Sequence, residues 1–230
     1  MNYALRFLRI VDATPVWMSV VTVTIGAYGS VLVWIDPGSV DDALGMLMLW
    51  QMLAASRGFA RPASAGYFDP LLVRESRRSI AAAHAVHAAA PVAMAWAALG
   101  AIEALNGTPG PLAFEPGRIS AFVFVSAAAW TVSLPAPRLV TGSLWLALIV
   151  AAATTRFGIE QYAAMLSRPE GVAQTAQAVA FVFVCPFVML ESVLPARAVL
   201  GGALAAGALA SIACGAVYIA RRNYPLEASL

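Results

Sequence analysis

The chain has 230 residues, of which 61% are hydrophobic and only 11% are charged, and its formal net charge is +2. A soluble domain carries about 25% charged residues and lacks repeated apolar runs of about 20 residues, the length that crosses a bilayer. All 14 basic residues are arginines, which excludes a G-x-x-x-x-G-K-[ST] nucleotide-binding loop because that loop needs a lysine. The composition predicts an all-α, polytopic integral membrane protein forming a single domain over residues 1–230.

The N-terminal part of the chain predicts a surface helix followed by a first span. Residues 1–14 are too short and too charged to cross a membrane, and their leucines alternate with arginines as in an interfacial helix. The apolar run 15–35 is long enough to cross. Trp17 and Trp34 lie near its two ends, where aromatic side chains favour the headgroup region.

Six further apolar runs follow the acidic turn at 36–42. They cover residues 43–60, 80–104, 119–135, 139–156, 173–194 and 198–220. Because cytoplasmic loops are enriched in arginine, the arginines of the N-terminus and of the loop 57–79 indicate a cytoplasmic N-terminus. The acidic turn and the loop 105–118 then lie outside.

The run 173–194 decides whether the chain has six spans or seven. It contains Pro186 near its middle and Glu191 near its end. If it enters and returns on one face, the C-terminus is cytoplasmic and 10 of the 14 arginines lie inside. We therefore expect six transmembrane helices plus a re-entrant hairpin before the last span, covered by protein, since irregular backbone at membrane depth needs cover.

The loop 57–79 combines charge with apolar side chains. It holds five of the 14 arginines, which ordinary anchoring on the cytoplasmic side would explain by itself. It also contains an apolar cluster that anchoring does not require: Tyr67, Phe68, Leu71, Leu72 and Val73. A short amphipathic helix of this composition fits a groove on another protein, because aromatic and arginine side chains often dominate interfaces.

The same loop resembles the loop after the second span in type-two ATP-binding-cassette (ABC) permeases, the six-span exporter family. In that family a Gly-Thr-Leu-Glu-Leu-Leu-Leu segment and a following Pro-x-Ser-Arg form the coupling helix. Here the segment from Gly66 to Leu72 has the matching order, and Ser76-Arg77 matches the Ser-Arg. Pro70 interrupts the leucine run, and the acid that precedes the glycine in the family is missing.

The resemblance implies the transmembrane subunit of an ABC exporter in the cell inner (plasma) membrane of a bacterium, with both termini cytoplasmic. It implies a soluble ABC ATPase subunit and a second permease chain as partners, besides membrane lipids. ATP and Mg would be bound by the partner ATPase, and this chain would have no cofactor, no enzymatic activity and no nucleic-acid partner. The residues that would couple to the ATPase are Gly66, Tyr67, Phe68, Asp69, Leu71, Leu72, Arg74, Arg77 and Arg78.

Two other functions remain open from the sequence. The chain could be an accessory or scaffold membrane protein of a larger complex, whose arginine-rich loop binds another partner or anionic lipid. It could also be an intramembrane enzyme using an acid together with the only two histidines, His84 and His87.

Some polar residues inside the apolar runs are further candidate sites. The spacing of His84 and His87 places both on one face of a helix, where hydrogen bonding is expected rather than a metal site, since other ligands are lacking. Glu103 and Glu191 are expected to face water, and Glu191 could line a substrate exit path. Cys214 is expected to be buried as a small apolar residue.

Overall fold

The computed structural model describes residues 16–55, 76–108, 110–135 and 194–221, with single residues at 143, 171 and 186. Most of these residues are helical, and none of them lies in a strand. The α-helices are α2 (Val16–Ile35), α3 (Val40–Ala55), α6 (Arg77–Leu105), α7 (Pro116–Ser133) and α11 (Leu194–Arg221), and the short 3-10 helices are η1 (Pro37–Ser39) and η2 (Leu112–Phe114). The expected all-α class is confirmed in this part of the chain.

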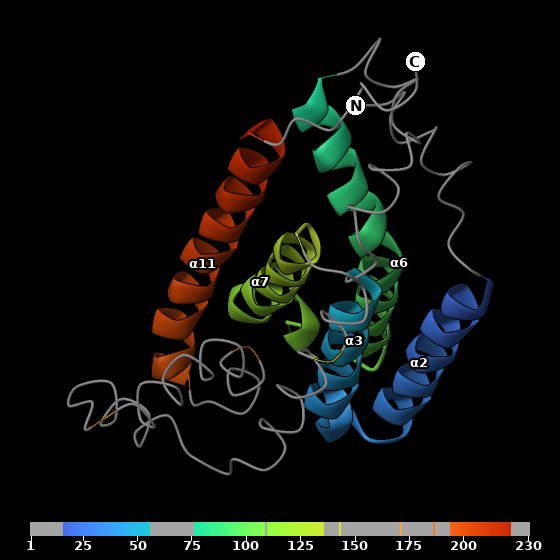
Figure 1. Cartoon of the computed structure of the whole chain (residues 1–230). Helices are drawn as coiled ribbons and strands as arrows, with labels where there is room; N and C mark the ends of the chain where they lie inside the picture. Colours follow the sequence, from blue (N-terminus) through green and yellow to red (C-terminus); the bar gives the residue numbers. More distant parts are fainter. Residues whose placement is uncertain are drawn as a thin grey trace.

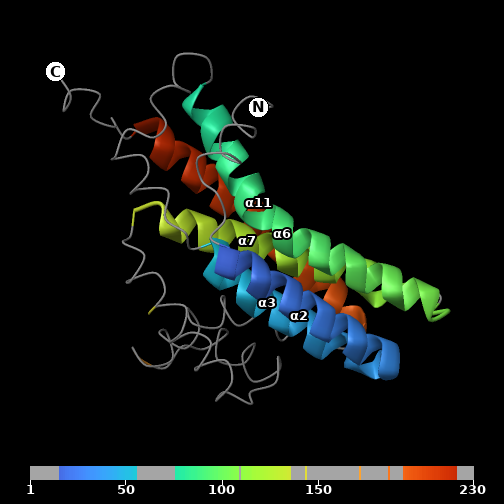
Figure 2. The ribbon, with the colours of Figure 1, turned by 90° about the vertical axis from the view of Figure 1, so that its right-hand side faces the viewer.

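The helices form one bundle in which they run roughly along a common direction (Figure 2). In Figure 1, α2 and α11 lie on the two flanks and α3 and α7 lie between them. The longest helix, α6, packs against α2, α3, α7 and α11, and α7 has its largest contact with α11. The buried core joins residues from α2, α3, α6, α7 and α11.

Contacts between side chains fix the direction of each helix. Trp50, near the last described turn of α3, donates a hydrogen bond to Thr22 in the first half of α2. Trp130, near the end of α7, donates one to His84 near the start of α6, and its ring lies against Gly215 near the end of α11. The starts of α2 and α6 and the ends of α3, α7 and α11 therefore share one end of the bundle, which we call the loop end.

The other end of the bundle, which we call the opposite end, carries the two connections that the structure describes. Residues 36–39 join α2 to α3 through η1, and residues 106–115, of which residue 109 is not described, join α6 to α7 through η2. Asn106 donates a hydrogen bond to the carbonyl of Val33 at 3.2 Å, so the two connections lie side by side.

Three of the described helices are long and apolar enough to cross a membrane. They cover Trp17–Ile35, Arg78–Leu105 and Leu200–Ile219. The helices α3 and α7 have 16 and 18 described residues, which corresponds to about 24 and 27 Å against a hydrocarbon core of about 30 Å. More than half of the residues of each are buried inside the bundle. Three of the expected spans are therefore helices with the length and apolar character that crossing requires.

Small residues of α11 let the aromatic side chains of α7 approach its backbone. A Cβ atom on Gly207 would lie 2.8 Å from the ring of Phe124, and one on Gly215 would lie 2.5 Å from the ring of Trp130. Both distances are shorter than van der Waals contact, so these positions accept only glycine without rearrangement. The glycine- and alanine-rich sequence of α11 therefore serves helix packing, as membrane helices commonly do.

Several sequence predictions lie outside the described residues. They are the interfacial helix 1–14, most of the coupling loop 57–79, and, apart from single positions, the runs 139–156 and 173–194, including Glu191. Another prediction was wrong: Cys214 is exposed on α11 and not buried, because α11 packs on α7 through a different face. Trp17 and Trp34 are 58% and 61% exposed at the two ends of α2, as an aromatic belt requires.

Candidate functional site

The coupling residues predicted from the sequence lie between α3 and α6. Gly66, Tyr67, Phe68, Asp69, Leu71, Leu72 and Arg74 are outside the described residues, whereas Arg77 and Arg78 form the first turn of α6. The described part of α3 finishes at Ala55 and α6 starts at Arg77, both at the loop end. The structure thus places the two attachment points of the loop on one end of the bundle.

The start of α6 is defined by a side-chain cap. Ser76 has extended backbone angles, and its Oγ accepts a hydrogen bond from the amide of Ser79 at 3.2 Å. A serine at this position satisfies one of the amides that have no partner inside the helix. Arg78, the second residue of α6, is exposed. The Ser-Arg pair of the sequence motif therefore coincides with the boundary between loop and helix.

His84 is buried one to two turns into α6. It is 2% exposed, and its Nδ1 accepts a hydrogen bond from Nε1 of Trp130 at 3.3 Å. An accepting Nδ1 belongs to an imidazole that carries its proton on Nε2. This histidine ties α6 to α7 beside the contact of α7 with α11, which is a structural role at the loop end.

His87 faces a different helix. Together with Pro91 and Met94 it lines a groove of about 730 Å³ between α6 and α2, to which α2 contributes Ser19, Thr22, Val23, Gly26, Ala27 and Ser30. Side chains three positions apart on an α-helix differ by about 60° in direction, which is enough to separate His84 on α7 from His87 on α2. The two histidines thus project from adjacent positions on α6, as their spacing predicts, but their described neighbours belong to different helices, α7 for His84 and α2 for His87.

Gln51 is a buried polar residue that sequence reasoning missed. Its side chain is 0% exposed, and neither its amide nitrogen nor its amide oxygen has a hydrogen-bond partner among the described residues. It lies on α3 one turn before Ala55, close to the loop end. Buried amides without partners are rare and cost free energy, so Gln51 is a weak point in the packing of the helix that leads into the coupling loop. A lone glutamine inside an apolar run is the signal that could have revealed it.

Glu103 is buried at the opposite end, which contradicts the expectation that it faces water. Its side chain is 1% exposed, and its two carboxylate oxygens accept hydrogen bonds from the amides of Leu112 at 3.0 Å and Ala113 at 2.8 Å. The carbonyl of Ala113 in turn accepts a hydrogen bond from Nε1 of Trp96 at 2.8 Å. The sequence could not show that η2 folds back onto the last turns of α6.

Arg118 is a second buried charge at the opposite end. It is 1% exposed and forms an ion pair with Asp41, while its Nη1 lies 3.4 Å from the carboxylate of Glu115. The pair joins the first turn of α7 to the first turn of α3. Sequence reasoning placed both residues on the outer side of the membrane but did not predict their contact.

The described residues offer no constellation of catalytic or metal-binding groups. Among them, no group of three or more His, Cys, Asp or Glu side chains could hold a metal ion. The polar contacts found, at His84, Glu103 and Arg118, each join one helix or connection to another. These contacts hold α3 and α6 in place, the helices that come before and after the loop 57–79.

Comparison of the chain with protein-family models, with curated proteins and with solved structures finds no match.

Proposed function

We propose that the chain is the transmembrane subunit of an ABC exporter and couples ATP hydrolysis by a separate soluble ATPase to movement of a substrate across the membrane. The observation that carries this proposal is the sequence of the loop 57–79 at its position between α3 and α6. The apolar cluster Phe68, Leu71 and Leu72 would enter a groove on the ATPase. Asp69, Arg74, Arg77 and Arg78 would form the polar rim of that contact.

The start of α6 supports this reading of the loop. In the family that the loop resembles, the third span begins directly after the Ser-Arg pair. Here Ser76 caps α6 and Arg77 is its first residue. A displacement of the loop would therefore act on α6 without an intervening flexible linker.

The directions of α7 and α11 support six spans. Phe124 and Trp130 of α7 meet Gly207 and Gly215 of α11 in the same order along the chain, so the two helices are parallel. If both 139–156 and 173–194 crossed the membrane, the chain would return to the loop end before α11. We therefore propose that 139–156 crosses and that 173–194 is re-entrant.

The distribution of charge supports a cytoplasmic loop end. Of the five arginines in the described ranges, three lie at the loop end, which has no described acid, and two lie at the opposite end: Arg77, Arg78 and Arg221 against Arg118 and Arg197. The opposite end has five described acids, at Asp36, Asp41, Asp42, Glu103 and Glu115. Cytoplasmic segments are enriched in basic residues, so we propose that both termini and the coupling loop are cytoplasmic.

The mechanism follows from this arrangement. ATPase states that contact the loop unequally shift the permease between conformations, because a partner moves an equilibrium only by its differential affinity. The loop is attached to α3 and α6, so these helices receive the motion first. A second permease chain would supply the other wall of the substrate path. Glu191 is our candidate for a residue that lines it.

The coupling contact is tested by replacing Phe68→Asp and Leu72→Asp together in the tagged chain. We expect the copurified ATPase, measured per chain after mild detergent extraction, to fall at least about tenfold, because two charges would enter an apolar groove. The matched control is Leu105→Asp, which adds a charge at the 77%-exposed last residue of α6, at the opposite end. Equal capture by the double variant and the wild type would refute the docking contact.

A further inference from the structure

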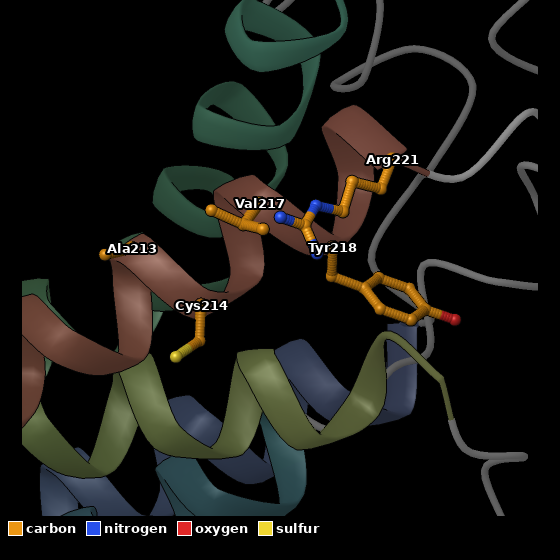
Figure 3. Close-up of a pocket in the computed structure, with 5 residues that line it drawn as sticks. All are labelled: Ala213, Cys214, Val217, Tyr218 and Arg221. Carbon is orange, nitrogen blue, oxygen red and sulfur yellow. The ribbon is translucent and has the colours of Figure 1, made fainter.

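A shallow pocket at the loop end of α11 has the composition of a lipid-binding site. It has a volume of about 710 Å³, and the described residues that line it, all from α11, are Ala213, Cys214, Val217, Tyr218 and Arg221. Figure 3 shows the guanidinium of Arg221 lying back along the helix, between Val217 and the ring of Tyr218, with Cys214 farther along the same helix. The volume lies within the range of small-molecule sites.

The pocket straddles the end of a candidate membrane span. The span on α11 covers Leu200–Ile219, so Ala213, Cys214 and Val217 lie within membrane depth whereas Arg221 lies just beyond it. Val217 is 49% exposed and Cys214 is exposed, so both are accessible from the side of the bundle. Arginine and tyrosine are the side chains that favour this boundary because they join an apolar stem to a polar tip.

Arg221 supplies a positive charge that nothing in the described part of the chain neutralises. The side chain is exposed, and it makes no ion pair or hydrogen bond with described residues. The carbonyl groups at the end of α11 carry partial negative charge, so the guanidinium must provide the attraction for an anion. A guanidinium binds phosphate through paired hydrogen bonds.

We propose that this pocket binds one anionic phospholipid of the leaflet at the loop end. The phosphate pairs with Arg221, the headgroup lies beside Tyr218, and the first part of an acyl chain lies along Val217, Cys214 and Ala213. A soluble phosphate would use only the charged part of the pocket, whereas a phospholipid also covers the apolar part. Basic side chains next to the end of a membrane helix attract anionic headgroups in this way. The proposal does not depend on the exporter function.

The test compares binding of phosphatidylglycerol and phosphatidylcholine to the full, delipidated chain in detergent by native mass spectrometry. We expect the wild type to retain one phosphatidylglycerol with a Kd at least about tenfold lower than that for phosphatidylcholine. Arg221→Gln should abolish this preference. The matched control, Arg78→Gln, removes an exposed arginine at the same end that does not line the pocket and should leave the preference unchanged.

Cys214→Phe tests the apolar part of the pocket without changing charge. We expect it to weaken phosphatidylglycerol binding several-fold while the chain elutes as the wild type does. Equal loss of preference in Arg221→Gln and Arg78→Gln would overturn the site in favour of general surface charge. Full competition by inorganic phosphate would overturn the lipid in favour of a soluble anion. Cross-linking of two chains through Cys214 would overturn it in favour of a second copy.

Discussion

The two ends of the bundle are held together by different chemistry. At the opposite end, Glu103 binds two amides of η2, and Arg118 joins α7 to α3 through Asp41. At the loop end, α2 and α3 are joined by the bond of Trp50 to Thr22, and α6 and α7 by that of Trp130 to His84. Among the described residues, the charged contacts lie at the opposite end, together with the neutral bond of Trp96 to Ala113, whereas the contacts at the loop end are neutral and aromatic.

This difference suggests how the molecule moves. Hydrogen bonds to buried charges are stronger and more costly to break than neutral ones, so the opposite end is the fixed point of the bundle. The described part of the loop end has neutral ties, the buried amide of Gln51 and the attachment points of the loop. Buried atoms without a hydrogen bond occur at both ends, because Nε and Nη1 of Arg118 also lack one. If the proposed ATPase moves the loop, we expect the loop ends of α3 and α6 to be displaced about their opposite ends.

The largest expected effect comes from removing the carboxylate of Glu103. Glu103→Ala leaves the amides of Leu112 and Ala113 without acceptors, and we expect a loss of about 3 kcal/mol in the free energy of unfolding. For a chain of this size that corresponds to a Tm about 6–12 °C lower in a detergent melting experiment. Glu103→Gln, which keeps one acceptor, should lose about half as much. A Tm of Glu103→Ala equal to that of the wild type would contradict the fixed opposite end.

Asp41→Ala should have the next largest effect because it leaves Arg118 buried without its closest partner. Breaking a fully buried pair costs about 3–5 kcal/mol. The Asp41 side chain is 35% exposed, so solvent screening reduces the expected loss to about 2 kcal/mol, or roughly 4–8 °C in Tm.

The double variant Asp41→Ala with Arg118→Met measures the coupling within this ion pair. Replacing both charged partners by apolar groups removes the buried, uncompensated guanidinium, so the double variant should melt above Asp41→Ala alone. Additive losses from the two changes would show that the pair does not join α3 to α7.

Gly215→Ala tests the packing at the loop end. Its Cβ would lie 2.5 Å from the ring of Trp130, so we expect a loss of about 1–2 kcal/mol from the displaced aromatic side chain. Gly202→Ala is the matched control on the same helix, because nothing lies within 4 Å of its Cβ. A Tm lowered equally by both variants would point to the helix itself and not to its contact with α7.

Gln51→Leu should have the smallest effect, and with the opposite sign. It removes a buried amide without partners, so we expect the free energy of unfolding to rise by about 1 kcal/mol. In the same variant we also expect substrate to stimulate the partner ATPase less, because a better packed α3 moves less when the loop is displaced. A lower Tm for Gln51→Leu would show that the amide is satisfied in the resting state.

The sequence was informative about where helices lie. The run 15–35 matches α2 (Val16–Ile35), and 198–220 matches α11 (Leu194–Arg221) to within a few residues. Such runs are predictable because their length and apolar character are local properties of the chain.

The sequence was uninformative about contacts between distant residues. Asp41 and Arg118 are 77 positions apart, and nothing local indicates that they meet. Glu103 was expected to face water because it lies near a helix end, but η2 covers it. The different neighbours of the two histidines also depend on long-range packing, because α7 packs beside His84 and α2 packs beside His87.

The most direct test of the account is to replace Phe68 with the photoreactive p-benzoylphenylalanine and irradiate intact cells. If the chain is an exporter subunit, we expect a major cross-linked product with a soluble protein that carries a G-x-x-x-x-G-K-[ST] loop, because Phe68 would lie in the groove of the ATPase. The same label at Leu105, at the opposite end, should give no such product. Cross-links from position 68 only to lipids or to other membrane proteins would contradict the exporter function.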